Sequence, residues 1–246
     1  MSTDFTLAGY RSLMDAFLER GYQAQRFAVA DPDNKSLVLR HDLDMSMQAA
    51  LPIAEIENDM GLTATYFVMV RSEMYNPLSP RCLSALETLT KLDHEIGIHL
   101  DASLYTDIDA LDEAAERECA ALEAVTGRPM AILSFHRPAK ELQGLERCIA
   151  GRRHTYQPHF FNDMGYCSDS RGGWYRGHPL DHPALVEGRA LQLLTHPIWW
   201  HAAPGDSVRE KLDRFVLGRF DLLRAELARN CDSYTQEFRA LDPEPP

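Results

Sequence analysis

Two aspartates stand two positions apart in the run Arg40-His41-Asp42-Leu43-Asp44, which closes an apolar segment. Side chains alternate along a strand, so Arg40, Asp42 and Asp44 share one face while His41 points away. Two carboxylates at this spacing can divide the work: one binds a divalent metal, and the other acts as a general base on a water molecule. The structural alternative is that Asp44 caps the helix that follows.

Three histidines occupy the same kind of position at the ends of further apolar segments. His99 closes EIGIH, His136 follows MAILSF, and His196 follows LQLLT. A single buried histidine is more often a core residue than a ligand, but several at strand ends favour a site. Asp44, His99 and His136 make a ligand set that leaves coordination positions open for water and substrate. His196 is then available as a general acid, and Asp169 can orient its ring.

These residues need a scaffold that brings the ends of several strands together. Apolar runs alternate with amphipathic segments, which is typical of a parallel sheet with helical crossovers. In a parallel barrel the carboxyl ends of the strands meet at one face, where active sites are built. We predict helices over 6–20, 46–60, 79–92, 107–125, 141–150 and 206–229, and strands over 37–41, 63–70, 95–99, 130–135, 164–168 and 191–195.

The sequence contains no internal repeat and no linker rich in Pro, Gly or Ser. Its 246 residues are also close to what one (β/α) barrel uses. We therefore predict a single α/β domain over 1–246, with the chemical motifs within 40–200, a C-terminal helix over 206–229 and a frayed tail over 242–246.

Composition limits the class of protein. The 25 Lys and Arg against 37 Asp and Glu give a net charge of −12, which argues against nucleic-acid or anionic-membrane binding. No apolar stretch reaches the roughly 18 residues of a membrane span, and the N-terminus lacks the form of a signal peptide. The five cysteines are scattered and include no C-x-x-C pair. The sequence thus predicts a cytoplasmic protein that is not inserted in a membrane.

The motifs HDLD, HEIGIH, SFHRP, YCSDSRGGW and LLTHP, in that order, resemble those of the NodB-homology polysaccharide deacetylases, carbohydrate esterase family 4. The resemblance covers about residues 35–200 and is strongest to a divergent bacterial branch. It implies a distorted (β/α) barrel that hydrolyses N-acetyl groups on sugars with a divalent metal, commonly zinc. It also implies that Asp42 is the base and His196 the acid. Asp44 and His99 would be metal ligands.

Departures from the family pattern change the expected ligand set. The family usually has a second histidine four positions after the first, where this sequence has Ser103. Serine is a poor metal ligand, so we predict His136 as the third ligand. His136 stands where the family usually has an arginine, and Arg137 follows it as a nearby cation. The spacing from Asp169 to Trp174 matches the fourth motif only loosely.

The sequence therefore predicts a metal-dependent hydrolase of an N-acylated sugar or sugar conjugate, with zinc as the first choice of metal. Arg71, Arg137 and Trp174 are the predicted substrate contacts, with loop packing the alternative for Arg71 and rim packing for Trp174. A cytoplasmic enzyme would meet a polysaccharide precursor. Two alternatives stay open: a non-catalytic carbohydrate-binding barrel, which Ser103 favours, and a hydrolase of a non-sugar amide that uses the same metal site.

Overall fold

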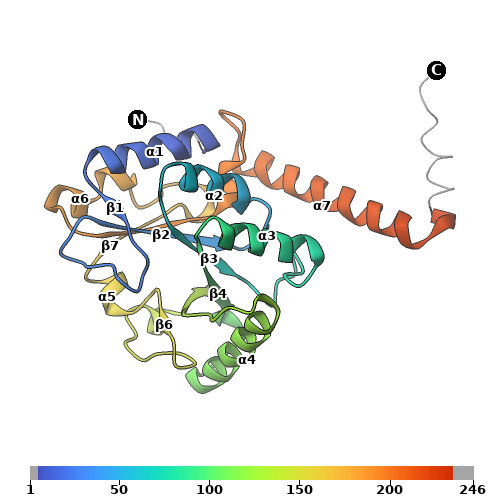
Figure 1. The fold of residues 1–246 in the computed structure, drawn as a ribbon, viewed down its shortest axis with the longest axis horizontal. Coiled ribbons are helices and arrows are strands. Elements are labelled where there is room, and N and C mark those ends of the chain that lie inside the picture. The colour runs from blue at the N-terminus through green and yellow to red at the C-terminus, as the bar shows by residue number, and fades with distance from the viewer. Residues whose placement is uncertain (1–4, 235–246) are drawn as a thin grey trace. The chain divides into compact units, whose positions relative to one another are not determined.

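The computed structural model describes residues 5–234 and contains one parallel sheet with helices packed against it (Figure 1). The sheet has eight strands in the order β6-β5-β4-β3-β2-β8-β7, with β1 beside β2. Within residues 5–234 no ladder joins β6 to β7, so the sheet is a distorted barrel with an open seam. The strands are β1 (Gln23–Ala24), β2 (Ser36–Leu43), β3 (Ala64–Val68), β4 (Glu95–Asp101), β5 (Ile132–His136), β6 (Arg153–His154), β7 (Gly165–Ser168) and β8 (Leu191–Thr195).

Helices connect the strands, and most of the connections are long enough to cross over the sheet as parallel pairing requires. The α-helices are α1 (Leu7–Glu19), α2 (Ala50–Asp59), α3 (Pro80–Lys91), α4 (Ile108–Thr126), α5 (Pro158–Phe161), α6 (Pro183–Glu187) and α7 (Val208–Asn230). Short 3₁₀ helices are η1 (Ala102–Leu104), η2 (Lys140–Leu142), η3 (Ser170–Gly172), η4 (Pro179–Asp181) and η5 (Pro197–Trp200). The predicted α/β class and distorted barrel are confirmed.

The helix predicted over 141–150 is wrong. Only η2 forms near its start, and the chain then turns repeatedly. Gly144 has φ +88° and Ala150 has φ +49°, and both values lie outside the right-handed helical region. The backbone N–H of Gly144 instead donates to the carbonyl of Tyr156 at 2.8 Å.

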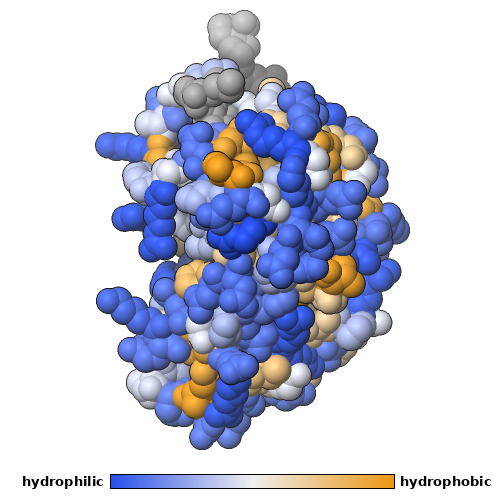
Figure 2. Space-filling model, turned by 90° about the vertical axis from the view of Figure 1, so that its left-hand side faces the viewer, coloured by the Kyte–Doolittle hydropathy of each residue, from blue (hydrophilic) through white to orange (hydrophobic). Residues whose placement is uncertain are grey.

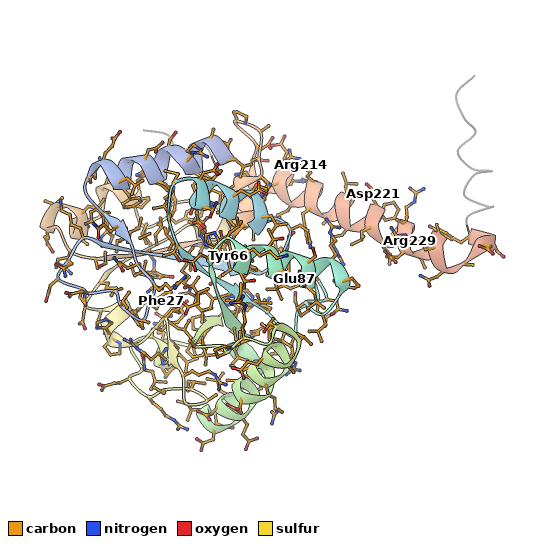
Figure 3. All side chains as sticks on the ribbon, viewed as in Figure 1. Phe27, Tyr66, Glu87, Arg214, Asp221 and Arg229 are labelled. Carbon is orange, nitrogen blue, oxygen red and sulfur yellow. The ribbon has the colours of Figure 1, made fainter. Side chains whose placement is uncertain are left out.

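The chain divides into two compact units, residues 1–204 and 205–246. The second contains α7, whose first turn is closed by a capping box between Ser207 and Glu210. Arg214, Asp221 and Arg229 project from this helix in Figure 3. The predicted single domain stays a prediction, and the predicted frayed tail lies outside the described residues. Between residues 5 and 234, no helix combines the length and apolar character that crossing a bilayer takes.

The core lies on both faces of the sheet, because every residue of β2 and β3 is buried. On the face toward α2, the carboxylate of Glu57 accepts from the hydroxyls of Tyr10 (2.5 Å) and Tyr66 (2.6 Å). Tyr66 is labelled in the interior in Figure 3. Burial would raise the pKa of Glu57, but His41, whose Nε2 lies 2.8 Å away, holds it below its usual value.

The face of the molecule in Figure 2 is mainly hydrophilic, with small separate hydrophobic spots.

Gly97 of β4 allows the sheet to pack closely at its centre. A Cβ atom there would lie 2.6 Å from Cε1 of Phe67 and 2.8 Å from the backbone oxygen of Ile132. Neither neighbour can move freely, since Phe67 is fully buried and Ile132 is part of β5.

We expect Gly97→Ala to lower the free energy of unfolding by about 1–3 kcal/mol, because overpacking forces neighbouring groups apart. Gly218→Ala is the matched control, since an added Cβ meets nothing within 4 Å on α7. It should leave stability unchanged or raise it by up to about 1 kcal/mol. Urea unfolding curves measure both, and equal effects of the two substitutions would contradict the packing argument.

Candidate metal centre and active site

Asp42 lies on the inner face of β2 and is held by a buried arginine on the same strand. Arg40 Nε donates to Oδ1 of Asp42 at 2.9 Å, and its Nη2 donates to Oδ2 at 2.8 Å. Arg40 is 0% exposed and Asp42 is 3% exposed. Burial would raise the pKa of Asp42, but the guanidinium and nearby His99 hold it below its usual value. Asp42 is therefore an ionised carboxylate that Arg40 holds in one orientation.

His99 of β4 is oriented by a hydroxyl on the neighbouring strand. Its Nδ1 lies 2.5 Å from Oγ of Ser134 on β5, and that hydroxyl lies 3.5 Å from Oδ1 of Asp42. If Nδ1–H donates to Ser134, the hydroxyl is free to donate to Asp42. This assignment leaves the lone pair of His99 Nε2 unused, as a metal ligand requires.

Asp44, His99 and His136 converge at the carboxyl ends of β2, β4 and β5. One potential ligand atom from each lies within 4.8 Å of the others. Oδ1 of Asp44 is 3.1 Å from Nε2 of His99 and 3.5 Å from Nδ1 of His136. Ligands of a tetrahedral zinc ion, each bound at about 2.0–2.1 Å, stand about 3.3 Å apart, so the spacing fits a metal.

The bonding of Asp44 also fits a metal site. Its Oδ1 is buried and makes no hydrogen bond to any described residue, although the two imidazoles stand close to it. Burial would raise the pKa of Asp44, but His136, His99 and His196 hold it well below its usual value. A buried carboxylate oxygen without a hydrogen-bond donor is costly. A cation between the three side chains would remove that cost.

His196 follows β8 and is tied to Asp169, which follows β7. Nδ1 of His196 lies 2.7 Å from Oδ1 of Asp169, whose Oδ2 also accepts from Nε1 of Trp200 at 2.9 Å. Nε2 of His196 faces the metal cluster, 3.7 Å from Oδ2 of Asp44. Burial would lower the pKa of His196, but the bond to Asp169 and the nearby carboxylates raise it to about 9. The raised pKa favours the protonated form of the ring.

The three predicted substrate contacts lie in different surroundings in the structure. Arg71 is exposed, and its Nη1 donates to the phenol of Tyr105 at 2.8 Å. Arg137 is also exposed, with φ +50°, and its Nη1 lies 3.7 Å from Asp101. Trp174 is half-buried, and its ring centroid lies 6.2 Å from that of Trp200. Their roles toward a substrate stay predictions, as do the roles of the six catalytic and metal residues.

The sequence prediction assigned no role to two residues that shape this site, Arg40 and Ser134. Arg40 pairs with Asp42, and the predicted Arg137 stays a candidate cation next to His136. The strand parity already placed Arg40 on the same face, so a search for partners at i and i+2 would have found it. Ser134 gives no such signal, because its contact with His99 depends on the register between β4 and β5.

Comparisons with known proteins yield solved structures only; no protein-family model and no curated protein matches this chain. One similar structure is a family 4 carbohydrate esterase from Bacillus anthracis, with 15% identity over 85% of this chain and 86% of that one, at TM-score 0.45. A peptidoglycan deacetylase from Bdellovibrio bacteriovorus has 19% identity over 80% of this chain and 53% of that one, at TM-score 0.43.

A third similar structure is a family 4 pseudoenzyme from Bacillus anthracis, with 14% identity over 78% of this chain, at TM-score 0.41. This chain spans 63% of the length of that pseudoenzyme. Two of these three structures are named as members of carbohydrate esterase family 4, and the other is named a peptidoglycan deacetylase.

We expect Arg40→Met to lower the free energy of unfolding by about 3–5 kcal/mol, because it leaves the buried carboxylate of Asp42 without its partner. The control is Arg11→Met, which removes the exposed ion pair with Asp59 (3.1 Å) and should cost less than about 1 kcal/mol. Chemical denaturation of both variants measures the difference. Comparable losses would show that the Arg40–Asp42 pair is not the main constraint at this position.

Proposed function

We propose that this protein is a zinc-dependent hydrolase that removes the acyl group from an N-acetylated sugar or sugar conjugate. The observation that carries the proposal is the convergence of three ligand atoms of Asp44, His99 and His136 within 4.8 Å of one another. A carboxylate, Asp42, and an imidazole, His196, lie beside this cluster. Metal ligands, a base and an acid are the groups that amide hydrolysis at a metal requires.

Asp44, His99 and His136 would hold the ion. A bound divalent metal supplies a Lewis acid that makes a water molecule more acidic and stabilises the negative charge formed on the acyl oxygen. Two imidazoles and one carboxylate are a ligand set that zinc accepts in catalytic sites. The hydroxyl of Ser134 holds the His99 ring in place from the side away from the ion.

Asp42 would take the proton of the attacking water. Its Oδ2 lies 3.5 Å from Nε2 of His99, so it borders the proposed ion. The two bonds from Arg40 fix the plane of the carboxylate, so no rotation is needed when water binds. The same pair keeps Asp42 ionised, which a base must be before it acts.

His196 would give its proton to the leaving amine. An amide nitrogen leaves poorly as an anion, so protonation is needed for the bond to break. Asp169 accepts from Nδ1 and from the backbone N–H of His196, which fixes the ring and directs Nε2 toward Asp44. Asp169 is thus a positioning residue in this proposal.

A sugar substrate is supported by the order of the five sequence motifs, and by aromatic residues near the site. Arg71, Arg137 and Trp174 are the proposed contacts at its edge. A cytoplasmic location is part of the proposal and is supported by the five cysteines, which are odd in number, scattered along the sequence and include no C-x-x-C pair.

A carbohydrate-binding barrel without catalysis is the second candidate, and Ser103 favours it. The hydroxyl of Ser103 is on an exposed residue and donates to Oδ1 of Asp101 at 2.6 Å. The position that usually carries a second histidine therefore supplies no ligand. Catalysis then depends on His136 completing the set from β5.

We expect purified protein to bind about one zinc ion per chain, and His99→Ala and His136→Ala each to lose it, because each removes one of three ligands. Metal analysis after dialysis measures the content. His159→Ala is the control, since that ring bonds to the carbonyl of Ala30 on a different part of the fold. Metal retained by His136→Ala would contradict the ligand set, and a wild type without metal would favour the binding barrel.

We expect His196→Ala to reduce the rate of acetate release by about 10²- to 10⁴-fold, because the amine then leaves without a proton donor. The metal content should stay at the wild-type level, since Nε2 of His196 is outside the ligand cluster. Acetate assays with N-acetylglucosamine oligomers, run beside metal analysis, test both points. Loss of the metal in His196→Ala would show that this histidine is a ligand.

A further inference from the structure

A cavity of about 170 Å³ opens at the seam where β6 and β7 do not pair. Its walls combine aromatic rings, hydroxyls and two guanidinium groups. The residues that carry the argument are Tyr156, Tyr166, Ser168, Arg171, Tyr175 and Arg176. None of these residues belongs to the Asp44–His99–His136 cluster, and none is among the site residues that the sequence predicted.

The cavity borders the proposed catalytic groups on two sides. The phenol oxygen of Tyr156 lies 3.4 Å from Nη2 of Arg40, the same nitrogen that donates to Asp42. On the other side, Ser168 directly precedes Asp169, the partner of His196. The cavity and the proposed site are therefore neighbours in the fold.

The charged side chains that line the cavity are both positive. No aspartate or glutamate lines it. Arg171 and Arg176 are exposed, and among residues 5–234 neither has an acidic partner within 4 Å, a feature that they share with other exposed arginines such as Arg71 and Arg128. The two guanidinium groups therefore place positive charge at one cavity of a chain whose net charge is −12.

The backbone holds Arg171 in a conformation that few arginines adopt. Its φ is +66°, and Gly172 follows at +78°. The backbone N–H of Gly172 donates to the carbonyl of Asp169 at 2.9 Å, so the turn is anchored beside the proposed acid. The guanidinium of Arg171 stands 5.0 Å from the ring centroid of Tyr175, which limits its movement. Strained backbone of this kind is often retained at binding sites.

We propose that this cavity binds an anionic substituent, a phosphate or a carboxylate, on the substrate of the adjacent site. A guanidinium donates in parallel to two oxygens of either anion. The hydroxyls of Ser168 and Ser170 lie 2.5 Å apart and bond to each other, so this pair adds one further donor. The aromatic walls contact the apolar faces of a sugar ring. The inference rests on the proposed function and narrows it from N-acylated sugars in general to those that carry a negative charge.

Calorimetric titration of the full chain with three N-acetylated sugars tests the proposal. They are the methyl glycoside of N-acetylglucosamine, N-acetylglucosamine 1-phosphate and N-acetylmuramic acid, which are neutral, phosphorylated and carboxylated. We expect at least one anionic sugar to bind more tightly than the neutral one by about tenfold or more, because charge-assisted hydrogen bonds add to affinity. The anion that binds more tightly identifies the substituent.

The double variant Arg171→Gln/Arg176→Gln should lose this preference while binding the neutral sugar as before. Arg171→Lys, which keeps the charge but not the parallel donors, should retain part of it. The control is Arg128→Gln/Arg219→Gln, which removes the same net charge from two exposed positions, one of them in the connection from α4 to β5. The control should keep the preference.

Equal binding of neutral and anionic sugars by the wild type would overturn the proposal, as would equal losses in the two double variants. Acetate release from the same sugars separates this result from the proposed function. Hydrolysis of neutral and anionic sugars at equal efficiency would refute the anion site and leave the hydrolase intact. Selective binding of the anionic sugars without any acetate release would uphold the anion site and refute the hydrolase.

Discussion

Charge buried in the centre of a sheet must be paired, and β2 carries three titratable side chains in succession. Arg40 and His41 are 0% exposed and Asp42 is 3% exposed. An unpaired charge in such a place costs several kcal/mol. Because neighbouring residues of a strand face opposite ways, the partners must come from both sides of the sheet. Asp42 meets Arg40 on the inner side, and His41 meets Glu57 of α2 on the outer side. The packing of α2 against the sheet and the site inside it are thus fixed by the same strand.

This pairing also fixes the position of the side chains at the site. Arg40 is occupied on several sides, since it bonds to Asp42 and to Oε1 of Gln192 on β8, and lies over the ring of Tyr156. The carboxylate of Asp42 is therefore fixed to a group that cannot turn away. Ser134 extends the network from Asp42 to β5. Groups held in this way need little reorganisation when charge develops in a reaction. Such preorganisation of polar groups is the main source of electrostatic stabilisation in enzymes. The cavity beside Tyr156 is connected to the same arginine.

The sequence was sufficient for those features that depend on local pattern. Alternation along one strand placed Arg40, Asp42 and Asp44 together, and the strand ends were visible because apolar runs stop there. The sequence was insufficient for features that depend on pairing between segments far apart in the chain. β6 has two residues and no periodic signal, yet it pairs with β5 and extends the sheet. The segment 141–150 contains helix-forming residues, but Gly144 at positive φ turns the chain toward Tyr156. The contact between Ser134 and His99 likewise depends on the register between β4 and β5, and no local pattern records that.

The relation between Ser103 and His136 follows from the geometry of adjacent strands. Asp101 of β4 pairs in register with His136 of β5, and neighbouring strands run about 4.8 Å apart. A ligand supplied just beyond the end of β4 can therefore be replaced by one from the end of β5 without moving the ion far. The chain after β4 turns away into η1, where Asp101 accepts from the backbone N–H of Ser103 at 3.1 Å and caps the turn. Because that segment serves as a cap, its polar groups form hydrogen bonds within the turn. Under the proposed function, His136 on β5 is the nearest position from which an imidazole can complete the site.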